Sequence, residues 1–459
     1  MLDLQTAAEA LGAWHSGANV TFTAVTTDSR QIQAGDLFVA LRGERFDGHA
    51  YVDAALDAGA VAAMVEEAEP VQRPNAPLIL VRDTRQALGR LAAFWRGRFT
   101  MPLVAVTGSN GKTTVKEMIA SVLRAAAGDD EVLATAGNLN NDIGVPLMLL
   151  RLRDQHRYAV IEMGMNHLGE ISYLTRLAEP DVALVNNAGV AHIGELGSRA
   201  AIARAKGEIY EGLSESGVAL INADDDFAEL WRDLNRGRKV IEFGIDHPAT
   251  ITAQYELSAT GSLVSFRTPE SEYAAHLQVP GLHNVRNALA AATAAFALAI
   301  PPDSVAEGLA HYGGTKGRLQ RKATRVGAVL IDDTYNANPD SVKAAIAVLA
   351  AASGERILVL GDMGELGDEA PALHAEVGEQ ARRAGIEHLL TLGELSAATA
   401  QAFGRGGRQF RELDALCSTL ESLIRPDMTV LVKGSRFMRM ERVVERFATG
   451  GSQPTQGDH

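Results

Sequence analysis

From about residue 100 onward, short runs of apolar residues alternate with stretches of helical periodicity. The first runs are "PLVAVTG", "RYAVIEMG", "DVALVNNAG" and "GVALINADD", and each ends in glycine or polar residues. A helical pattern follows most of them. This alternation predicts a parallel sheet that is covered by helices.

The same pattern starts again near Arg318, with "AVLIDDTYNANP", "RILVLGDMGELG", "HLLTLGE" and "TVLVKGSRF". Before residue 99 the apolar runs are short and separated by turn signals, and the tail "TGGSQPTQGDH" has no apolar residues. We therefore predict an α/β protein with domains at 1–98, 99–316 and 317–450, and a disordered tail at 451–459. The length of 459 residues agrees with this division, at roughly 150 residues per domain.

Composition narrows the possible partners and the compartment. The chain has 43 Lys plus Arg against 57 Asp plus Glu, a net charge of -14, which disfavours nucleic-acid binding. Cys417 is the only cysteine, so no disulfide can form within the chain, which suits a reducing compartment. The Ala-rich run at 287–300 is too short for a membrane span and predicts a buried helix. Because the N-terminus also lacks the features of a secretion signal, we expect a cytoplasmic protein.

The segment "VAVTGSNGKTTVKEMIA" carries the strongest functional signal. A β-type run ends in a glycine-rich turn, and Lys, two threonines and a helix follow, as in a loop that binds nucleotide phosphates. Lys112 would reach the β- and γ-phosphates and Thr113 would bind Mg²⁺. The usual pattern has glycine where this chain has Val106, so the loop is a shorter variant. The alternative is a glycine-rich turn before an ordinary helix. The predicted nucleotide contacts are Thr107, Gly108, Ser109, Asn110, Gly111, Lys112, Thr113 and Thr114.

Polar residues that follow the other apolar runs are candidates for a metal site. Glu162 follows "RYAVI" and His192 follows the next run, so both lie where the carboxyl ends of parallel strands meet. Mg²⁺ prefers oxygen ligands, and Glu162 supplies them. Each residue alone is a weak signal, since an isolated histidine is more often structural. Lys206 lies in the helical stretch "AIARAKGEIYEGL" and, taken alone, is expected on the surface.

Together these motifs resemble the Mur ligase family over nearly the whole chain. "TGSNGKTT" is similar to the ATP loop of that family, and "HNVRNALAA" resembles its helix beside the adenine, which implies that Asn284 and Asn287 bind the nucleotide. The resemblance further implies that Glu162 and His192 bind magnesium, with two ions in the site. It also implies that Lys206 carries a carbamate made with CO₂, which supports the second ion. Lys112, Lys206 and His192 are the implied catalytic residues.

The resemblance extends to both outer domains. "TTDSR" and "GDLFVALRGERFDGH" are similar to an N-terminal UDP-binding α/β domain, which implies that Ser29 and Arg30 lie near the uridine diphosphate. "GTKGRLQR" resembles the entry to a Rossmann-like C-terminal domain behind a central ATPase domain. Further implied contacts are Arg318 and Asp333 for the nucleotide, Asn336 and Asn338 for substrate, and "VLVKGSR" for an incoming amine.

Within the family, "DDTYNANPDS" and "LGDMGELG" are similar to members that add D-alanyl-D-alanine, and the "DNPR" motif of those that add meso-diaminopimelate is absent. The resemblance thus implies an ATP-dependent ligase of peptidoglycan synthesis. Its substrates would be UDP-N-acetylmuramoyl-tripeptide and D-alanyl-D-alanine, joined through an acyl phosphate. Apart from the resemblance, we expect a monomer. The alternatives are another amide ligase of this architecture, a phosphate-loop ATPase that couples hydrolysis to movement, and an inactive binding protein. The third residue of the stem peptide and the general base stay open.

Overall fold

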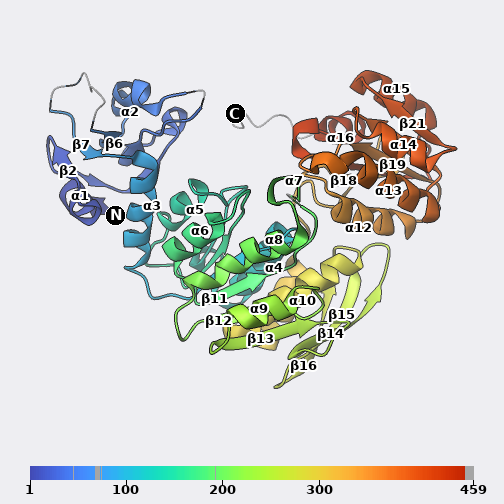
Figure 1. Cartoon of the computed structure of the whole chain (residues 1–459), viewed down its shortest axis with the longest axis horizontal. Coiled ribbons are helices and arrows are strands. Elements are labelled where there is room, and N and C mark those ends of the chain that lie inside the picture. Colours follow the sequence, from blue (N-terminus) through green and yellow to red (C-terminus); the bar gives the residue numbers. More distant parts are fainter. Residues whose placement is uncertain (45, 68–72, 74, 192, 450–459) are drawn as a thin grey trace.

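The computed structural model describes residues 1–44, 46–67, 73, 75–191 and 193–449. These residues form an N-terminal, a central and a C-terminal domain, and the two outer domains lie at opposite ends of the central one (Figure 1). Two of the sequence predictions, the disordered tail at 451–459 and the role of His192, lie outside the described residues. No helix in the described ranges combines the length and the apolar character that crossing a membrane requires.

The N-terminal sheet has the strand order β2-β7-β6-β5-β4, in which β2 is antiparallel and the other strands are parallel. A separate small pair joins β1 to β3. The strands are β1 (Leu2–Asp3), β2 (Trp14–Ser16), β3 (Thr21–Phe22), β4 (Ala24–Thr26), β5 (Asp36–Val39), β6 (Ala62–Glu66) and β7 (Leu78–Val81). The helices are α1 (Leu4–Leu11), α2 (Val52–Asp57) and α3 (Thr84–Arg96).

Helix α3 joins the N-terminal domain to the central one. Its buried residues Leu88 and Leu91 belong to one continuous hydrophobic core with Leu149 and Leu174 of the central domain. At the end of the helix, the Arg96 guanidinium donates from Nε to the Ala178 carbonyl at 2.9 Å. The two domains therefore share a core instead of meeting only through a linker.

The central sheet has the order β16-β15-β14-β13-β12-β11-β8-β10-β9. The strands from β9 to β14 are parallel, and β15 and β16 extend the sheet as antiparallel strands. Its strands are β8 (Leu103–Thr107), β9 (Val132–Ala134), β10 (Tyr158–Glu162), β11 (Val182–Val185), β12 (Val218–Asn222), β13 (Lys239–Gly244), β14 (Ile251–Leu257), β15 (Ser262–Arg267) and β16 (Glu272–Leu277). A parallel sheet was predicted from the runs that form β8, β10, β11 and β12, whereas β9, β13, β14 and the antiparallel extension were not predicted.

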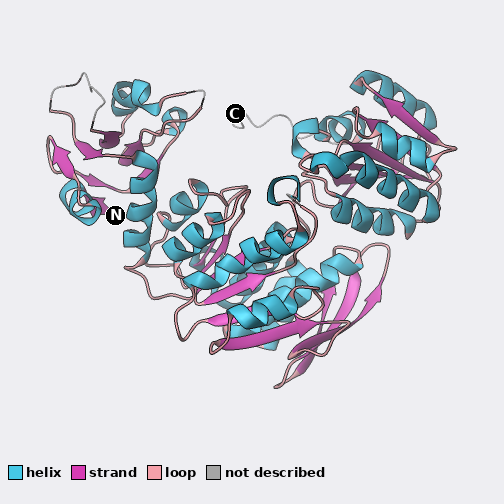
Figure 2. Cartoon of the chain, viewed as in Figure 1, coloured by secondary structure: helices cyan, strands magenta, loops and turns pink. Residues whose placement is uncertain are grey.

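Helices cover both faces of this sheet (Figure 2). They are α4 (Lys112–Ala127), α5 (Gly144–Leu149), α6 (Glu170–Ala178), α7 (Ile193–Leu196), α8 (Arg199–Gly207), α9 (Ala228–Leu234), α10 (Leu282–Ala297) and α11 (Pro302–His311). The Ala-rich run forms most of α10, and its residues from Ala288 to Ala292 are buried. The prediction of a buried helix is confirmed, because small alanine side chains let α10 lie closely under the sheet and beside α4.

The C-terminal sheet has the order β17-β18-β22-β19-β20-β21, with β17 antiparallel and the other strands parallel. The strands are β17 (Gln320–Ala323), β18 (Val329–Asp333), β19 (Arg356–Gly361), β20 (His388–Leu392), β21 (Gly407–Phe410) and β22 (Thr429–Lys433). One hydrophobic core lies on each face of the sheet. The covering helices are α12 (Pro339–Ala350), α13 (Ala370–Arg383), α14 (Ala397–Phe403), α15 (Leu413–Leu423) and α16 (Glu441–Phe447). All the apolar runs that predicted parallel strands form them.

Candidate active site

A cavity of about 1100 Å³ lies where the carboxyl ends of the central strands meet the start of the C-terminal domain. This is the edge at which open parallel sheets bind ligands, because the strand-to-helix loops gather there. The cavity is lined by most of the residues that the sequence singled out: Ser109, Asn110, Gly111, Lys112, Thr114, Glu162, Lys206, Asn284, Asn287, Arg318, Asp333, Asn336 and Asn338.

Other predicted residues lie outside the lining of the cavity. The Thr107 hydroxyl donates to the Met163 carbonyl at 2.8 Å, so it holds two neighbouring strand ends together. Gly108 of the same loop and Thr113 in the first turn of α4 are not among the residues that line the cavity. Ser29 and Arg30 belong to the N-terminal domain, where Arg30 is exposed and pairs with Asp28 at 2.9 Å. The cavity and the predicted UDP contacts are therefore separate regions of the chain.

The phosphate loop joins β8 to α4, as predicted. Gly108 and Gly111 have φ angles of +155° and +78°, which residues with a side chain rarely adopt. At Gly111 there is a second constraint, because a Cβ would lie 2.4 Å from Oδ1 of Asn287 on α10. Gly111 also supplies no side-chain cap, so the first N–H groups of α4 are left for a ligand.

Lys112 begins α4 and folds back on its own loop. Its Nζ donates to the carbonyls of Gly108 at 2.7 Å and Ser109 at 3.4 Å. Burial lowers the pKa of Lys112, and nearby Arg318 lowers it further, while Glu162 acts in the opposite direction. A phosphate group would provide the negative charge that this half-buried amine lacks.

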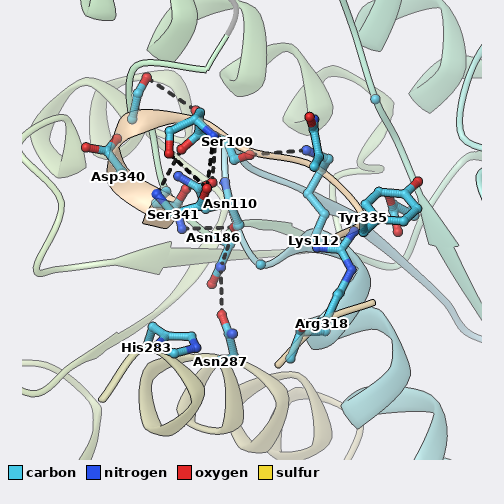
Figure 3. Close-up of a pocket in the computed structure, with 18 of the residues that line it drawn as sticks. Ser109, Asn110, Lys112, Asn186, His283, Asn287, Arg318, Tyr335, Asp340 and Ser341 are labelled. Atoms are coloured by element: carbon cyan, nitrogen blue, oxygen red, sulfur yellow. Dashed lines mark hydrogen bonds between the residues drawn. The ribbon is translucent and has the colours of Figure 1, made fainter. Parts of the chain in front are cut away.

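Arg318 reaches the phosphate loop from the start of the C-terminal domain. Its Nη2 donates to the Thr113 hydroxyl at 2.9 Å, and its guanidinium lies 4.3 Å from the centre of the Tyr335 ring (Figure 3). Its buried Nε has no partner among the described residues. Nε of this arginine can therefore donate to a negatively charged ligand group.

Glu162 ends β10 and is 2% exposed. One of its oxygens, Oε1, accepts from Nδ2 of Asn140 at 2.7 Å, and its backbone N–H donates to the Thr135 hydroxyl at 2.9 Å. The other oxygen, Oε2, is buried and has no partner within the described part of the chain. A buried carboxylate oxygen without a donor fits a cation such as Mg²⁺. Among the described residues, no three His, Cys, Asp or Glu side chains converge on one point.

Lys206 is not a surface lysine, as it would be expected to be from its local sequence. It lies in α8, is 1% exposed and lines the cavity. Burial lowers the pKa of Lys206 well below its ordinary value, and the positive charge of Lys112 acts in the same direction. Lys206 is buried because α8 packs against the core, and the local sequence pattern does not indicate this packing.

Asp333 and Lys433 form a buried pair at the carboxyl ends of neighbouring strands β18 and β22, with 2.6 Å between Oδ2 and Nζ. Asp333 also accepts from the backbone N–H of Leu319 at 3.2 Å. Lys433 donates in addition to the carbonyl of Asn336 at 2.9 Å. Lys433, which the sequence analysis predicted to lie beside an incoming amine, therefore donates to acceptors within its own domain.

The N-terminus of α12 contacts the central domain. Asn338 is the N-cap of this helix, and its Nδ2 donates to Oδ1 of Asn110 in the phosphate loop at 2.8 Å. Asp340 accepts from the backbone N–H of Val190 at 3.1 Å. Figure 3 shows Asp340 and Ser341 beside Ser109 and Asn110. Asn338 thus bridges the two domains.

Several site residues were missed by the sequence reasoning. They are Asn140, which orients Glu162, Asp340, and the pair Asn186 and Asn187, which bond to Asn110. A signal was present for the pair, since "NN" directly follows the apolar run "DVALV" at the edge where polar side chains gather. Nothing in the spacing of Asn140 or Asp340 points to their partners.

The fold and the site define a phosphate-loop nucleotide-binding protein whose loop is covered by a second α/β domain. The chain belongs to the Mur ligase family. Residues 106–295 match the Mur ligase middle domain, residues 317–436 match the Mur ligase glutamate ligase domain, and residues 21–96 match the Mur ligase family catalytic domain.

Individual relatives cover almost the full chain. UDP-N-acetylmuramoyl-tripeptide–D-alanyl-D-alanine ligase of Escherichia coli strain K12 is 44% identical over 95% of this chain and 96% of its own length. A crystal structure of MurF from Acinetobacter baumannii has a TM-score of 0.91 at 37% identity, covering 96% of this chain and 98% of that one. MurF ligase from Thermotoga maritima in complex with ADP has a TM-score of 0.81 at 28% identity, covering 92% and 96%.

Proposed function

We propose that this protein is an ATP-dependent ligase that adds D-alanyl-D-alanine to UDP-N-acetylmuramoyl-tripeptide in peptidoglycan synthesis. The proposal is carried by one observation: a phosphate loop, a buried carboxylate with an unpartnered oxygen and a buried lysine amine line the same cavity. It is supported by the name of the relative that is 44% identical over 95% of the chain. The ADP complex of a similar ligase supports ATP as the nucleotide.

The chemistry begins with a carboxylate, which is a poor acyl donor because its leaving group would be oxide. Its attack on the γ-phosphate of ATP forms an acyl phosphate and releases ADP. The amine of D-alanyl-D-alanine then attacks the acyl carbon, loses a proton and displaces inorganic phosphate. Lys112 and Arg318 would neutralise charge on the transferring phosphoryl oxygens, since both lie at the phosphate loop. Their part is positioning and electrostatic stabilisation.

Magnesium would be held at Glu162, whose Oε2 has no other partner in the described residues, and at Thr113 once Arg318 releases its hydroxyl. When bound, the ion draws charge from the phosphate oxygens. His192 stays a proposed ligand from the family resemblance and lies outside the described residues. We propose that the site binds two magnesium ions.

Lys206 is the proposed position of a carbamate. The neutral amine attacks CO₂, a C–N bond forms, and one proton is released to solvent. Only the unprotonated amine has the electron pair for this step, and burial favours that form, as the lowered pKa of Lys206 indicates. No carboxylate of the described chain pairs with Lys206. The carbamate would turn a buried cation into an anion that supports the second ion.

The remaining assignments belong to the same proposal. The N-terminal domain, 1–98, would bind the UDP part of the substrate with Ser29 and Arg30. Residues 99–316 would bind ATP, with Asn284 and Asn287 beside the adenine and Asp333 at the ribose. Residues 317–450 would receive the amine substrate, with Asn336 near it. We propose a cytoplasmic monomer that binds no nucleic acid.

The test is phosphate release from ATP and Mg²⁺ with UDP-N-acetylmuramoyl-tripeptide, with and without D-alanyl-D-alanine. We expect release that needs both substrates, together with a UDP-linked pentapeptide identified by its mass. Release that needs neither would instead identify an ATPase and would contradict the proposal.

The matched control is Lys112→Ala. We expect this variant to lose activity by about 100-fold or more, because it removes a donor that stabilises transition-state charge. Its fold should be retained since, among the described residues, the Lys112 amine donates only to carbonyls of its own loop. An unfolded variant by circular dichroism would contradict this role.

A further inference from the structure

Both backbone polar groups of Asn110, at the tip of the phosphate loop, are held by one side chain. The backbone N–H of Asn110 donates to Oδ1 of Asn187 at 2.9 Å, and Nδ2 of Asn187 donates to the carbonyl of Asn110 at 3.0 Å. The two bonds close a ring like that between paired backbone strands. Beside it, the N–H of Ser109 donates to the carbonyl of Asn187 at 3.0 Å.

The strand pairing places Asn187 for this contact. Strand β11 pairs in parallel with β8, so that Val185 lies opposite Thr107, and the Asn186 N–H continues the ladder to the Thr107 carbonyl at 2.9 Å. The two residues that follow β11, Asn186 and Asn187, therefore lie alongside the phosphate loop. The side chain of Asn187 extends the pairing of the two strands by one more residue, Asn110, beyond the end of the sheet.

The loop needs such a restraint because its glycines leave it free. Gly108 and Gly111, on either side of Asn110, adopt positive φ angles that only glycine reaches easily, so the peptide group between Asn110 and Gly111 could turn over. A turned peptide would point the Asn110 carbonyl, which carries partial negative charge, toward the phosphates. In the observed orientation that carbonyl accepts from both Asn187 and Asn186, the latter at 2.9 Å.

We propose that Asn187 is a positioning residue for nucleotide binding: its amide fixes the Asn110 backbone, including the carbonyl of the peptide group shared with Gly111, so that the N–H groups of Gly111 and Lys112 face the phosphates. The inference rests on the proposed function only in taking ATP as the ligand of the loop. A neutral amide is the suitable group, because it both accepts from the N–H and donates to the carbonyl. An aspartate would keep the first bond, lose the second and add a negative charge beside the phosphates.

The experiment compares Asn187→Ala and Asn187→Asp with the unmodified full-length protein. Binding of ADP is measured by calorimetry, and KM for ATP, KM for the UDP-linked tripeptide and kcat are measured in the ligase assay. We expect both variants to raise the Kd for ADP and the KM for ATP by about tenfold, the aspartate at least as much as the alanine. The KM for the tripeptide should stay within twofold.

Asn235→Asp is the control for a generic effect of replacing a buried asparagine. Asn235 is 1% exposed, its Nδ2 donates to the Trp231 carbonyl at 2.9 Å, and it lies outside the cavity. Its replacement should lower thermal stability and leave the KM for ATP unchanged. If Asn187→Ala fails to fold by circular dichroism, Asn187→Asp, which retains the acceptor, decides the test.

The inference is overturned if a folded Asn187 variant binds ADP within twofold of the unmodified protein. It is also overturned if Asn235→Asp raises the KM for ATP as much as the Asn187 variants do. The calorimetry needs no acceptor substrate, so it separates this inference from the proposed function. A protein that binds ADP but makes no pentapeptide would contradict the function and leave the role of Asn187 measurable.

Discussion

Two lysines of the central domain are buried to the same extent but in opposite surroundings. Lys116 and Lys206 are each 1% exposed. Lys116 donates to the Thr135 carbonyl at 2.7 Å and pairs with Glu117, whereas Lys206 has no such partner within the described residues. Burial lowers the pKa of Lys206 for that reason. A buried amine without a partner is available for a chemical reaction, whereas a paired one stabilises the fold.

Replacing Lys206 with alanine should therefore reduce the rate by about 10- to 100-fold, the cost typical of losing a group that supports a metal site. Formate or acetate should restore part of the rate, because a small carboxylate can occupy the space of the carbamate. The measurement is the ligase assay over a series of carboxylate concentrations. Lys116→Ala is the matched control, and its loss should appear as lower stability without rescue. Full activity of Lys206→Ala would remove the carbamate from the mechanism.

His374 is a buried titratable group away from the cavity. Its Nε2 accepts from the Met363 N–H at 3.0 Å, and its Nδ1 donates to the Ala370 carbonyl at 2.7 Å, so the ring is neutral. Burial lowers the pKa of His374 in the folded chain. The unfolded chain then binds a proton first, so the stability due to this group is present above about pH 6.5 and is lost as the pH falls below it.

We expect the melting temperature of the protein to fall from pH 7 to pH 5.5 more steeply than that of His374→Gln. His283, whose pKa burial lowers to about 4, contributes in the same direction and stays unchanged in both proteins. The difference between the two melting temperatures isolates His374. The same replacement at exposed His276 should leave the dependence of the melting temperature on pH unchanged. If His374→Gln also leaves this dependence unchanged, the neutral ring of His374 is not required.

At the scale of elements, helix α12 combines a local and a long-range role in one residue. Asn338 and Ser341 form a capping box, in which the Ser341 N–H donates to Oδ1 of Asn338 at 2.9 Å and the Asn338 N–H donates to the Ser341 hydroxyl at 3.0 Å. The remaining Nδ2 of Asn338 contacts Asn110. The cap uses the oxygen of the amide, and the contact between domains uses the nitrogen.

Asn338→Asp should separate these roles. It keeps an oxygen for the cap, so thermal denaturation should show a stability within about 0.5 kcal/mol of the unmodified protein, whereas Asn338→Ala should lose about 1 kcal/mol. Both variants lose the donor to Asn110, so the KM for ATP should rise in both. Equal destabilisation by Asp and Ala would mean that the cap does not depend on the oxygen.

The helix also illustrates what could be predicted at this scale. "NANPDS" indicated a turn and a helix start, and Asn338 does begin α12. Caps are readable because the residues involved are neighbours in the chain. The strands β15 and β16 were missed, although "SLVSFR" alternates in its burial. Each is one short run, and its antiparallel place depends on the strand that it meets.

For the whole molecule, the site is divided between domains that must meet. The predicted UDP contacts lie in the N-terminal domain and the proposed amine contacts in the C-terminal domain, at opposite ends of the central one (Figure 1). The chain enters the C-terminal domain through Gly314 and Gly317, which have φ angles of +98° and +70°. The acyl phosphate must also be kept from water. These requirements favour movement of the outer domains toward the centre.

We expect small-angle scattering to show a smaller radius of gyration when ATP, the UDP-linked tripeptide and D-alanyl-D-alanine are all present than in the free protein. Closure excludes water and completes the site, as in other enzymes with lids. D-alanyl-D-alanine alone, which contacts one domain, should leave the dimensions unchanged. Unchanged dimensions with all the substrates would contradict closure.

The sequence by itself determined the parallel strands formed by its apolar runs, the phosphate loop, the buried Ala-rich helix and the order of the motifs. Each depends on periodicity, glycine or capping among residues that are close in the chain. Tertiary structure alone decided that Lys206 is buried, that Asn140 holds Glu162 from 22 residues away, and that Asn187 holds Asn110 from 77. The contact between Asn338 and Asn110 spans 228 residues. Such contacts follow from how sheets and domains pack. The residues next to a polar side chain in the sequence do not indicate which distant residue it will contact.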